Sequence, residues 1–369
     1  MKLLVIGIGD CGCRIAREFA EMNRVAKAER HVDIITCAYG INNDAAMLEA
    51  LSDKSAPELF KPVPVRGSTA VDRSNEAGAN VMRQESERVM LALRLGAFVE
   101  TDAFMLVAAA GGSLGSGGIS VLAQLLKERR AGKPVYALVV LPFDSELGDR
   151  RIVQNSAVCV KSISRAADAV ILVDNGGLGT ETTVVPVEDM EKANREIVYQ
   201  FYDLLCAGEM MGPKYSGSKV LDAGDIIQTF AGWTSIGTGK APLGSSLLPW
   251  KRTESFDEKG SETLRAIEAM NMALMHLSVD CKLEDAGKAL FLLSAPPKQA
   301  NVDMIKVLGN RIRELAPNAE LRDGNFFGAK NFVQVTVVVS ELIYLDRVKT
   351  LYERAARLSA AAGSDAPAE

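Results

Sequence analysis

The sequence predicts an α/β fold: a doubly wound parallel sheet, then a long central helix, then a smaller C-terminal α/β domain. Three observations lead to this prediction. Apolar runs of strand length alternate with segments of helical periodicity, which is typical of a parallel sheet covered by helices. Runs such as residues 136–141 (YALVVL) are apolar throughout, as expected for strands buried on both faces. Two glycine-rich loops each connect a strand to a helix.

The first half of the chain supplies the elements of the predicted sheet in order. Residues 2–9 are an apolar run that ends in glycine, and residues 12–30 then place apolar side chains at helical spacing. Residues 52–80 are polar and proline-containing, so we expect a long excursion there. The remaining elements are strands over 32–38, 103–110, 134–141 and 169–173, and helices over 45–51, 79–95 and 119–130.

The second half has a different pattern. Residues 187–207 read as a long helical stretch, and residues 208–260 are rich in Gly, Ser and Pro. Helices are predicted over 261–277, 302–316 and 341–358, strands over 289–295 and 332–339, and a disordered tail from Ser359. A chain of 369 residues can bury two cores. We therefore place the domains at residues 1–186, 187–208 (the central helix), 209–345 and 346–369 (a last helix and tail).

Composition and charge exclude several classes of protein. The formal net charge is −5, so the basic footprint of a nucleic-acid-binding protein is missing. No apolar run approaches the ~20 residues of a membrane span, and the short N-terminal run is followed at once by Asp10 and Arg14. We therefore expect a cytoplasmic chain. None of the six cysteines forms a CxxC pair and only His31 and His276 are present, which argues against a His/Cys metal site and His-based catalysis.

The first glycine loop, residues 7–12 (GIGDCG), matches the GxGxxG pattern after a strand and before a helix. Its glycines let the backbone approach a phosphate, and the helix N-terminus supplies partial positive charge. A tight turn without a ligand remains an alternative. An NAD site would also need an acid about 20 residues further on. The nearest one after the second strand, Asp44, lies about 32 residues past the loop, which counts against a dinucleotide.

The second glycine loop, residues 111–118 (GGSLGSGG), holds five glycines and two serines between a strand and a helix of the same sheet. A nucleoside triphosphate could use both loops, one for each end of its phosphate chain. The loop is not a Walker A motif, because no Gly-Lys-Ser/Thr follows it. A flexible loop without a ligand is the alternative interpretation.

At this point the chain resembles the tubulin/FtsZ superfamily. Residues 111–117 are similar to that family's G-G-G-T-G-[ST]-G motif, and residues 9–12 to the G-x-C-G form of tubulins. Further similarities follow in the family's order: Asn42-Asn43-Asp44-Ala45, Pro142-Phe143 with Glu146 and Arg150, Asp174-Asn175, and Ala193-Asn194. Together with the loop of residues 221–226 they span residues 1 to about 225, and residues 287–340 fit the family's second domain.

The resemblance implies a Rossmann-like GTPase domain that binds GTP or GDP with Mg²⁺, and with a monovalent cation as a further candidate. It also implies head-to-tail polymerisation of the chain with itself. Asn175 and Asn194 would read the guanine edge, and Glu146 and Arg150 would reach the ribose. Asp10 is a candidate Mg²⁺ contact, while Cys11 would pack beneath the nucleotide. The full set of implied nucleotide contacts is Gly9, Asp10, Cys11, Gly12, Arg14, Asn42, Asp44, Gly111, Gly112, Ser113, Leu114, Gly115, Ser116, Gly117, Glu146, Arg150, Asn175, Met190 and Asn194.

The catalytic groups implied by the resemblance are Asp222 and Asp225, in the loop of residues 221–226. In the family, such a loop enters the nucleotide site of the next subunit and its acids orient the attacking water. A spacing of three lets both carboxylates point the same way at a helix start, which suits positioning of water or a hydrated cation. An N-cap pair for the following helix is the alternative, and both roles can hold together.

Departures from the family motifs lead to a second hypothesis. Ser113 and Leu114 replace a glycine and a threonine, and Val220 stands where the family has an asparagine. These changes motivate a nucleotide-binding filament or scaffold with little hydrolysis. An NAD(P)-dependent oxidoreductase is the third hypothesis and rests on the first glycine loop alone. The segments 72–74 (DRS) and 221–223 (LDA) resemble the CetZ-like branch, and the tail lacks the FtsZ peptide that docks membrane-tethering partners.

Overall fold

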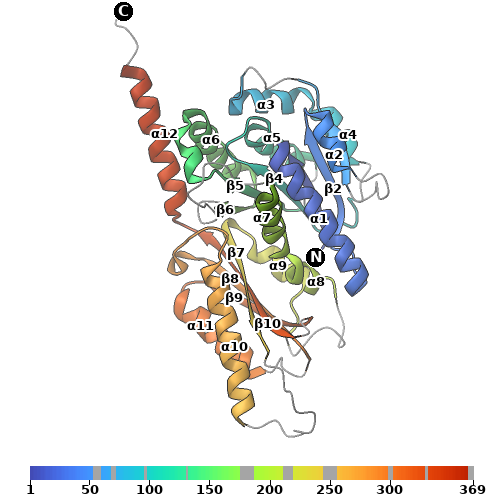
Figure 1. Cartoon of the computed structure of the whole chain (residues 1–369), viewed down its shortest axis with the longest axis vertical. Coiled ribbons are helices and arrows are strands. Elements are labelled where there is room, and N and C mark those ends of the chain that lie inside the picture. The colour runs from blue at the N-terminus through green and yellow to red at the C-terminus, as the bar shows by residue number, and fades with distance from the viewer. Residues whose placement is uncertain are drawn as a thin grey trace, which may run out of the picture. The chain divides into compact units, whose positions relative to one another are not determined.

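A computed structural model describes residues 1–52, 60–67, 72–94, 98–129, 132–174, 187–210, 219–243, 256–297, 302–328 and 331–364 (Figure 1). The chain divides into two compact units. The N-terminal unit comprises Lys2–Val198, Val279–Cys281 and Tyr344–Glu369, and the C-terminal unit comprises Met1, Tyr199–Ser278 and Lys282–Ile343. In the described part of the chain, none of the helices has the length and apolar character that a membrane span requires.

The N-terminal unit is built on parallel strands in the order β3-β2-β1-β4-β5-β6. Central β1 pairs with β2 on one side and β4 on the other, with Val5 level with Ala38 and Met105. Every residue of β1 and β5 is buried, as the continuous apolar runs predict. The predicted doubly wound parallel sheet is therefore confirmed. The strand bounds are β1 Leu3–Ile8, β2 Ile35–Asn42, β3 Phe60–Pro64, β4 Ala103–Ala109, β5 Val135–Leu141 and β6 Ala169–Asp174.

The order of these strands reverses between β1 and β4. The chain passes from β1 outward through β2 to β3, then returns to β4 on the other side of β1 and continues to β5 and β6. In open parallel sheets the crevice outside the carboxyl ends of the strands at such a switch point is the usual ligand site. The two glycine loops follow β1 and β4, so both open at this crevice.

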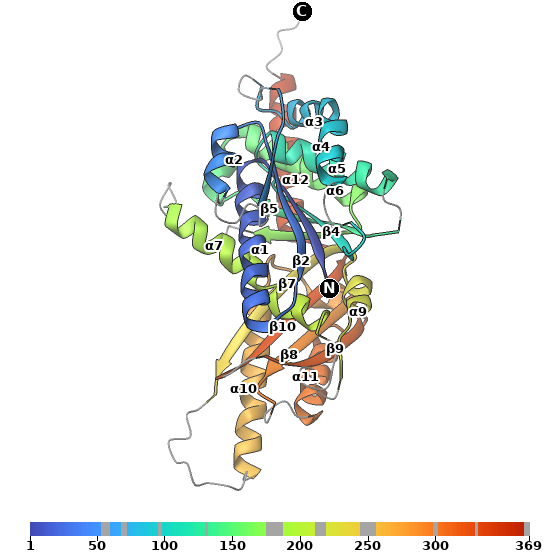
Figure 2. The same ribbon diagram turned by 90° about the vertical axis from the view of Figure 1, so that its right-hand side faces the viewer.

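Helices pack against this sheet and against one another. Helix α1 (Gly9–Arg30) contacts β1, β2 and β4, and α5 (Leu114–Arg129) contacts α3 (Asn75–Gln84), beside which it lies in Figure 2. The C-terminal helix α12 (Asp346–Ser364) packs along α6 (Arg150–Ala166), as Figure 1 shows. The other helical elements of this unit are α2 (Ala45–Leu51), α4 (Ser86–Arg94), the 3₁₀ turn η1 (Asp144–Gly148) and α7, which runs over Val187–Tyr199.

The C-terminal unit has a mixed sheet in the order β7-β10-β8-β9. Strand β10 (Phe332–Leu342) is antiparallel to β7 (Gly232–Pro242) and β8 (Lys288–Ala295), and β9 (Glu320–Phe327) is parallel to β8. Helix α10 (Phe256–Met275) packs directly on β7, because a Cβ at Gly237 or Gly239 would lie 2.1 Å from an α10 carbonyl oxygen. The remaining elements are α8 (Tyr202–Ala207), α9 (Ala223–Thr229), the 3₁₀ turn η3 (Leu283–Asp285) and α11 (Val302–Leu315).

Several elements differ from the sequence predictions. Strands β3, β7 and β9 and helix α6 were not predicted. Strand β3 lies in the segment 52–80, for which the sequence predicts an excursion; its Pro62 and Pro64 are accommodated because the strand is paired on one side only. The helix predicted over 79–95 is two helices, α3 and α4. The central helix predicted over 187–207 is also two, interrupted between Tyr199 and Tyr202.

The prediction of a disordered tail from Ser359 is wrong for residues 359–364. Helix α12 continues through them to Ser364. Alanine has the highest helix propensity of the amino acids, and the alanine-rich sequence here sustains the helix. The hydroxyl of Ser359 donates a hydrogen bond to the Ala355 carbonyl at 2.9 Å. Residues 365–369 lie outside the described residues.

Candidate functional site

A cavity of about 770 Å³ lies at the switch point of the N-terminal unit. Its volume is that of an ordinary small-molecule site. It is formed by the first turns of α1, the segments after β4 and β5, the start of α6 and helix α7. The lining residues are Asp10, Cys11, Arg14, Ala109, Gly111, Gly112, Val140, Leu141, Pro142, Phe143, Glu146, Ile152, Asp189, Met190, Glu191, Lys192, Ala193, Asn194 and Glu196.

The first glycine loop brings the start of α1 directly onto the sheet. A Cβ at Gly12 would lie 2.2 Å from the Val107 carbonyl oxygen of β4, so only glycine fits. Gly9 has φ of +72°, a backbone conformation that glycine adopts without strain. Helix α1 begins here without a side-chain cap, since its N-cap residue is Ile8. No N-cap side chain therefore bonds the first backbone N–H groups of α1. Uncapped N–H groups at a helix start are the usual arrangement of an anion site.

The glycines of the second loop divide into two groups. Gly115 and Gly117 serve packing: a Cβ at Gly117 would lie 2.0 Å from the Asn75 carbonyl oxygen of α3. Gly112 is different, because it lines the cavity and a Cβ there would meet no protein atom within 4 Å. At Gly111 a Cβ would lie 2.9 Å from a methyl group of Ile152. The backbone at Gly112 thus faces space that a ligand can occupy.

Asn155, on the unpredicted helix α6, holds the second loop in place. Its side chain is 4% exposed and makes four hydrogen bonds. The amide Nδ2 donates to the carbonyls of Arg73 (2.9 Å), Gly111 (3.1 Å) and Gly112 (3.4 Å), and Oδ1 accepts from the backbone N–H of Asn75 (2.8 Å). One buried amide therefore joins the segment before α3 to the cavity-lining glycines.

Serine hydroxyls complete this network. Ser116 is fully buried, and its Oγ donates to the Gly112 carbonyl and accepts from the Asn75 side chain at 3.1 Å. The hydroxyl of Ser113 donates to the Ser74 carbonyl at 2.6 Å. These two serines of the loop thus bind protein groups and do not line the cavity.

Replacing Asn155 with alanine is expected to lower the free energy of unfolding by about 2–3 kcal/mol, because four backbone groups in two chain segments lose a hydrogen bond to a buried side chain. Urea unfolding measures the loss. Lys161→Ala, an exposed position on the same helix, is the control and should change stability little. Equal stability of N155A and the unchanged protein would contradict the described network.

The residues after β1 combine a carboxylate with a protonated thiol. Asp10 is exposed and accepts a hydrogen bond from the Asn42 side chain at 2.6 Å. Burial raises the pKa of the Cys11 thiol to about 12, so Cys11 is neutral at physiological pH and is no nucleophile. In the described part of the chain, no group of three or more His, Cys, Asp or Glu side chains could hold a metal ion. A Mg²⁺ held by one carboxylate and substrate phosphates needs no such group.

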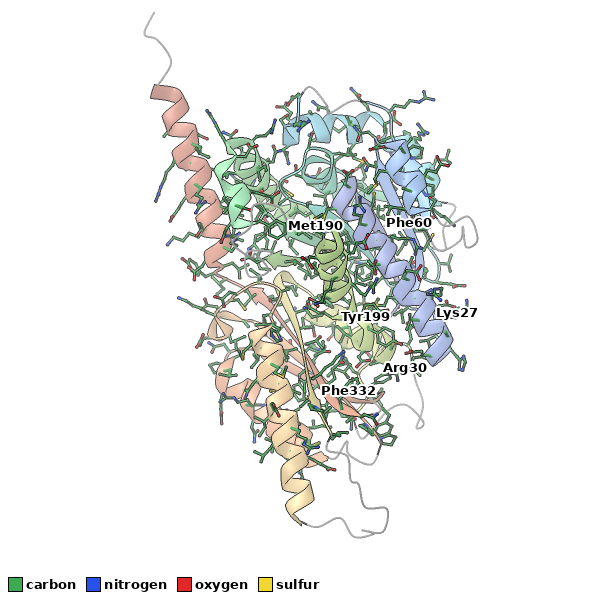
Figure 3. The ribbon with its side chains drawn as sticks, viewed as in Figure 1. Lys27, Arg30, Phe60, Met190, Tyr199 and Phe332 are labelled. Carbon is green, nitrogen blue, oxygen red and sulfur yellow. The ribbon has the colours of Figure 1, made fainter. Side chains whose placement is uncertain are left out.

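The β5 side of the cavity is a short turn. Pro142 and Phe143 line it, and the Glu146 carboxylate accepts the backbone N–H of Phe143 at 2.9 Å. Arg150 is the exposed first residue of α6, whose N-terminus is capped by Asp149. Helix α7 also lines the cavity, with Asn194 and the 40% exposed Met190 that Figure 3 labels.

The structure gathers a subset of the predicted contacts at the cavity. Asp10, Cys11, Arg14, Gly111, Gly112, Glu146, Met190 and Asn194 line it. Asn175 lies outside the described residues. Sequence reasoning missed Asn155, since the helix that carries it was not recognised. The predicted residues that do not line the cavity are Gly9, Gly12, Asn42, Asp44, Ser113, Leu114, Gly115, Ser116, Gly117 and Arg150.

The acidic pair lies in the C-terminal unit and caps α9. Asp222 Oδ1 accepts the backbone N–H of Asp225 at 2.8 Å, and Asp225 Oδ2 accepts that of Asp222 at 3.2 Å. Asp225 also lies 3.7 Å from the Arg322 guanidinium of β9. Asp222 remains exposed. The two aspartates thus form the N-cap of α9, as the alternative interpretation predicts, and Asp222 still faces solvent.

The segment leading to this acidic pair is fixed on β9. The backbone N–H of Asn325 donates to the Lys219 carbonyl at 2.9 Å, and the backbone N–H of Lys219 donates to Asn325 Oδ1 at 3.0 Å. The Lys219 ammonium also pairs with the buried carboxylate of Asp323 at 2.5 Å. The segment just before the two aspartates is therefore bonded to β9.

These features define an α/β protein with a small-ligand site at the switch point of its parallel sheet. Known proteins extend this conclusion. The family model for the Tubulin/FtsZ family, GTPase domain, matches residues 2–181, and that for the tubulin-like CetZ C-terminal domain matches residues 187–357. Tubulin-like protein CetZ1 of Haloferax volcanii is 30% identical over 372 residues, which cover 96% of this chain and 91% of that protein.

Solved structures agree. The GTPγS-bound protofilament of CetZ2 from Haloferax volcanii superposes with a TM-score of 0.81 at 25% identity, covering 98% of this chain and 100% of that one. The GDP-bound monomer of CetZ1 from the same organism gives a TM-score of 0.80 at 26% identity, with 97% and 100% coverage. The chain therefore belongs to the tubulin/FtsZ superfamily and, within it, to the tubulin-like CetZ proteins. The resemblance expected from the motifs is confirmed.

Proposed function

We propose that this chain binds GTP or GDP in the switch-point cavity, polymerises head to tail into filaments, and hydrolyses GTP where successive subunits meet. The observation that carries the proposal is the pair of glycine loops at one crevice, with Gly112 open to the cavity. Family membership supports the choice of nucleotide, and the GTPγS-bound protofilament of a similar protein supports self-assembly.

The cavity has room for each part of the nucleotide. The phosphates would face Gly111, Gly112 and the start of α1, where backbone N–H groups and the helix dipole favour anions. Asp10 is the candidate contact for Mg²⁺, an ion that would offset repulsion between its carboxylate and the phosphates. Asn194 would read the guanine edge, since an amide both donates and accepts hydrogen bonds.

Hydrolysis would use Asp222 and Asp225 of the next subunit. The two carboxylates are held by each other's backbone N–H groups at the start of α9, which suits orientation of a water molecule, and positioning is a main contribution that a protein makes to phosphoryl transfer. The second candidate function is a nucleotide-binding filament or scaffold with little GTP hydrolysis. Leu114 has no hydroxyl and is 5% exposed. The Ser113 hydroxyl donates to the Ser74 carbonyl, so neither residue offers a hydroxyl to a phosphate.

Right-angle light scattering and phosphate release, followed together after adding GTP and Mg²⁺, test the proposal. We expect scattering to rise with GTP and with GTPγS, and phosphate to appear with GTP alone. A rise in scattering without phosphate would support the non-hydrolysing filament. Binding of NADH without binding of GTP would contradict the guanine-nucleotide assignment and revive the oxidoreductase hypothesis.

A further inference from the structure

Arg347, near the start of the C-terminal helix α12, reaches into the strand ends beside the cavity. Its side chain is 14% exposed and lies among three oxygen atoms. Nη1 donates to Asp144 Oδ1 at 2.5 Å and Nη2 donates to the Pro142 carbonyl at 2.9 Å, while Nε lies 3.1 Å from Asp174 Oδ1 as an ion pair without hydrogen-bond geometry. All four residues belong to the N-terminal unit.

These three partners lie where two neighbouring strands end. Pro142 follows β5 and lines the cavity, and Asp174 is the last residue of β6, level with Leu141 in the strand register. Asp144 opens η1, the turn that carries the cavity-lining Glu146. A single guanidinium thus joins the carboxyl end of β6 to the turn after β5.

The chemistry of the contact favours a positioning role. A guanidinium presents several donors in a rigid plane, so it can fix the relative orientation of two carboxylates and a carbonyl. The ion pair with Asp144, a 69% exposed carboxylate, would contribute little stability by itself. Helix α12 also packs on α6, and its residues Val348 and Leu351 are buried. Arg347 is therefore not required to dock the helix.

We propose that Arg347 is a positioning residue for the nucleoside side of the cavity, and that the C-terminal helix thereby controls nucleotide affinity. The inference rests on the proposed function. Arg347 contacts the turn of residues 142–146, which follows β5 and lines the cavity, whereas the two glycine loops follow β1 and β4. Its loss should weaken binding of the base and ribose and leave the phosphate contacts unchanged.

The test compares GTP with inorganic tripolyphosphate, which has the phosphates alone. Titration with a fluorescent GTP analogue gives the dissociation constant, and displacement by tripolyphosphate gives its affinity. In Arg347→Ala the dissociation constant for GTP should rise about tenfold, while tripolyphosphate affinity changes less than about twofold. Arg347→Lys should recover part of the loss, since an ammonium cannot contact all three oxygens. Arg354→Ala, an exposed position on the same helix, is the matched control.

Asp144→Asn is a second variant, which removes the ion pair by changing its exposed partner. We expect a smaller rise in the dissociation constant for GTP and no change in that for tripolyphosphate. Unchanged GTP affinity in both variants would overturn the inference. An equal loss for GTP and tripolyphosphate would also overturn it, because that pattern indicates general distortion. If the unchanged protein binds neither GTP nor tripolyphosphate, the proposed function itself fails, and this outcome is visible before any variant is made.

Discussion

Alanine at Gly112 is expected to raise the dissociation constant for GTP about 100-fold or more without unfolding the protein. Gly112 lines the cavity, and the added methyl group would occupy open space in front of the loop backbone. It would keep a phosphate from the backbone N–H groups, and each lost charge-assisted hydrogen bond costs ~1.5–3 kcal/mol. The fold should survive, because the methyl group meets no protein atom and the φ angle of Gly112 is not positive.

Titration with a fluorescent GTP analogue measures this loss, and thermal unfolding without nucleotide checks the fold. Gly148→Ala is the matched control. A Cβ at Gly148 also meets no protein atom within 4 Å, but this glycine lies in η1 and does not line the cavity. If G112A binds GTP as tightly as G148A does, the prediction that this loop contacts the phosphates is wrong.

The parallel sheet and its two glycine loops could be predicted because their sequence signals are local. Each buried strand is a continuous apolar run, and each loop is a cluster of glycines between a strand and a helix. Strand β3 could not be predicted, because Pro62 and Pro64 are usual in loops. Only the structure shows that β3 pairs with β2 on one side, and such one-sided pairing accommodates the prolines.

The contacts that hold the candidate site could not be predicted, since they join distant parts of the chain. Asn155 binds the Gly111 carbonyl across 44 residues of sequence, and Arg347 binds Asp144 across 203. No local pattern marks such partners. The sequence also suggested that Ser113 stands where a ligand-binding glycine belongs, whereas in the structure its hydroxyl joins the loop to Ser74.

Asparagine at both Asp222 and Asp225 is expected to lower phosphate release about 100-fold or more while GTP still binds and scattering still rises. General-base or water-orienting groups contribute rate factors of this size. Asparagine is chosen because it caps helices as well as aspartate, so the cap of α9 survives and only the charges are lost. Asp303→Asn, an exposed acid of the same unit, is the control and should hydrolyse GTP normally.

Mixing the two kinds of variant decides whether the acids act on the nucleotide of a neighbouring subunit. A D222N/D225N subunit binds GTP but lacks the acids, and a G112A subunit carries the acids but binds GTP weakly. If the active site is shared, a G112A subunit beside a D222N/D225N subunit restores one complete site, so phosphate release should recover in the mixture. If co-assembly is seen by scattering and release stays low, the acids do not act across the subunit contact. Their role would then be the cap of α9 that the structure describes.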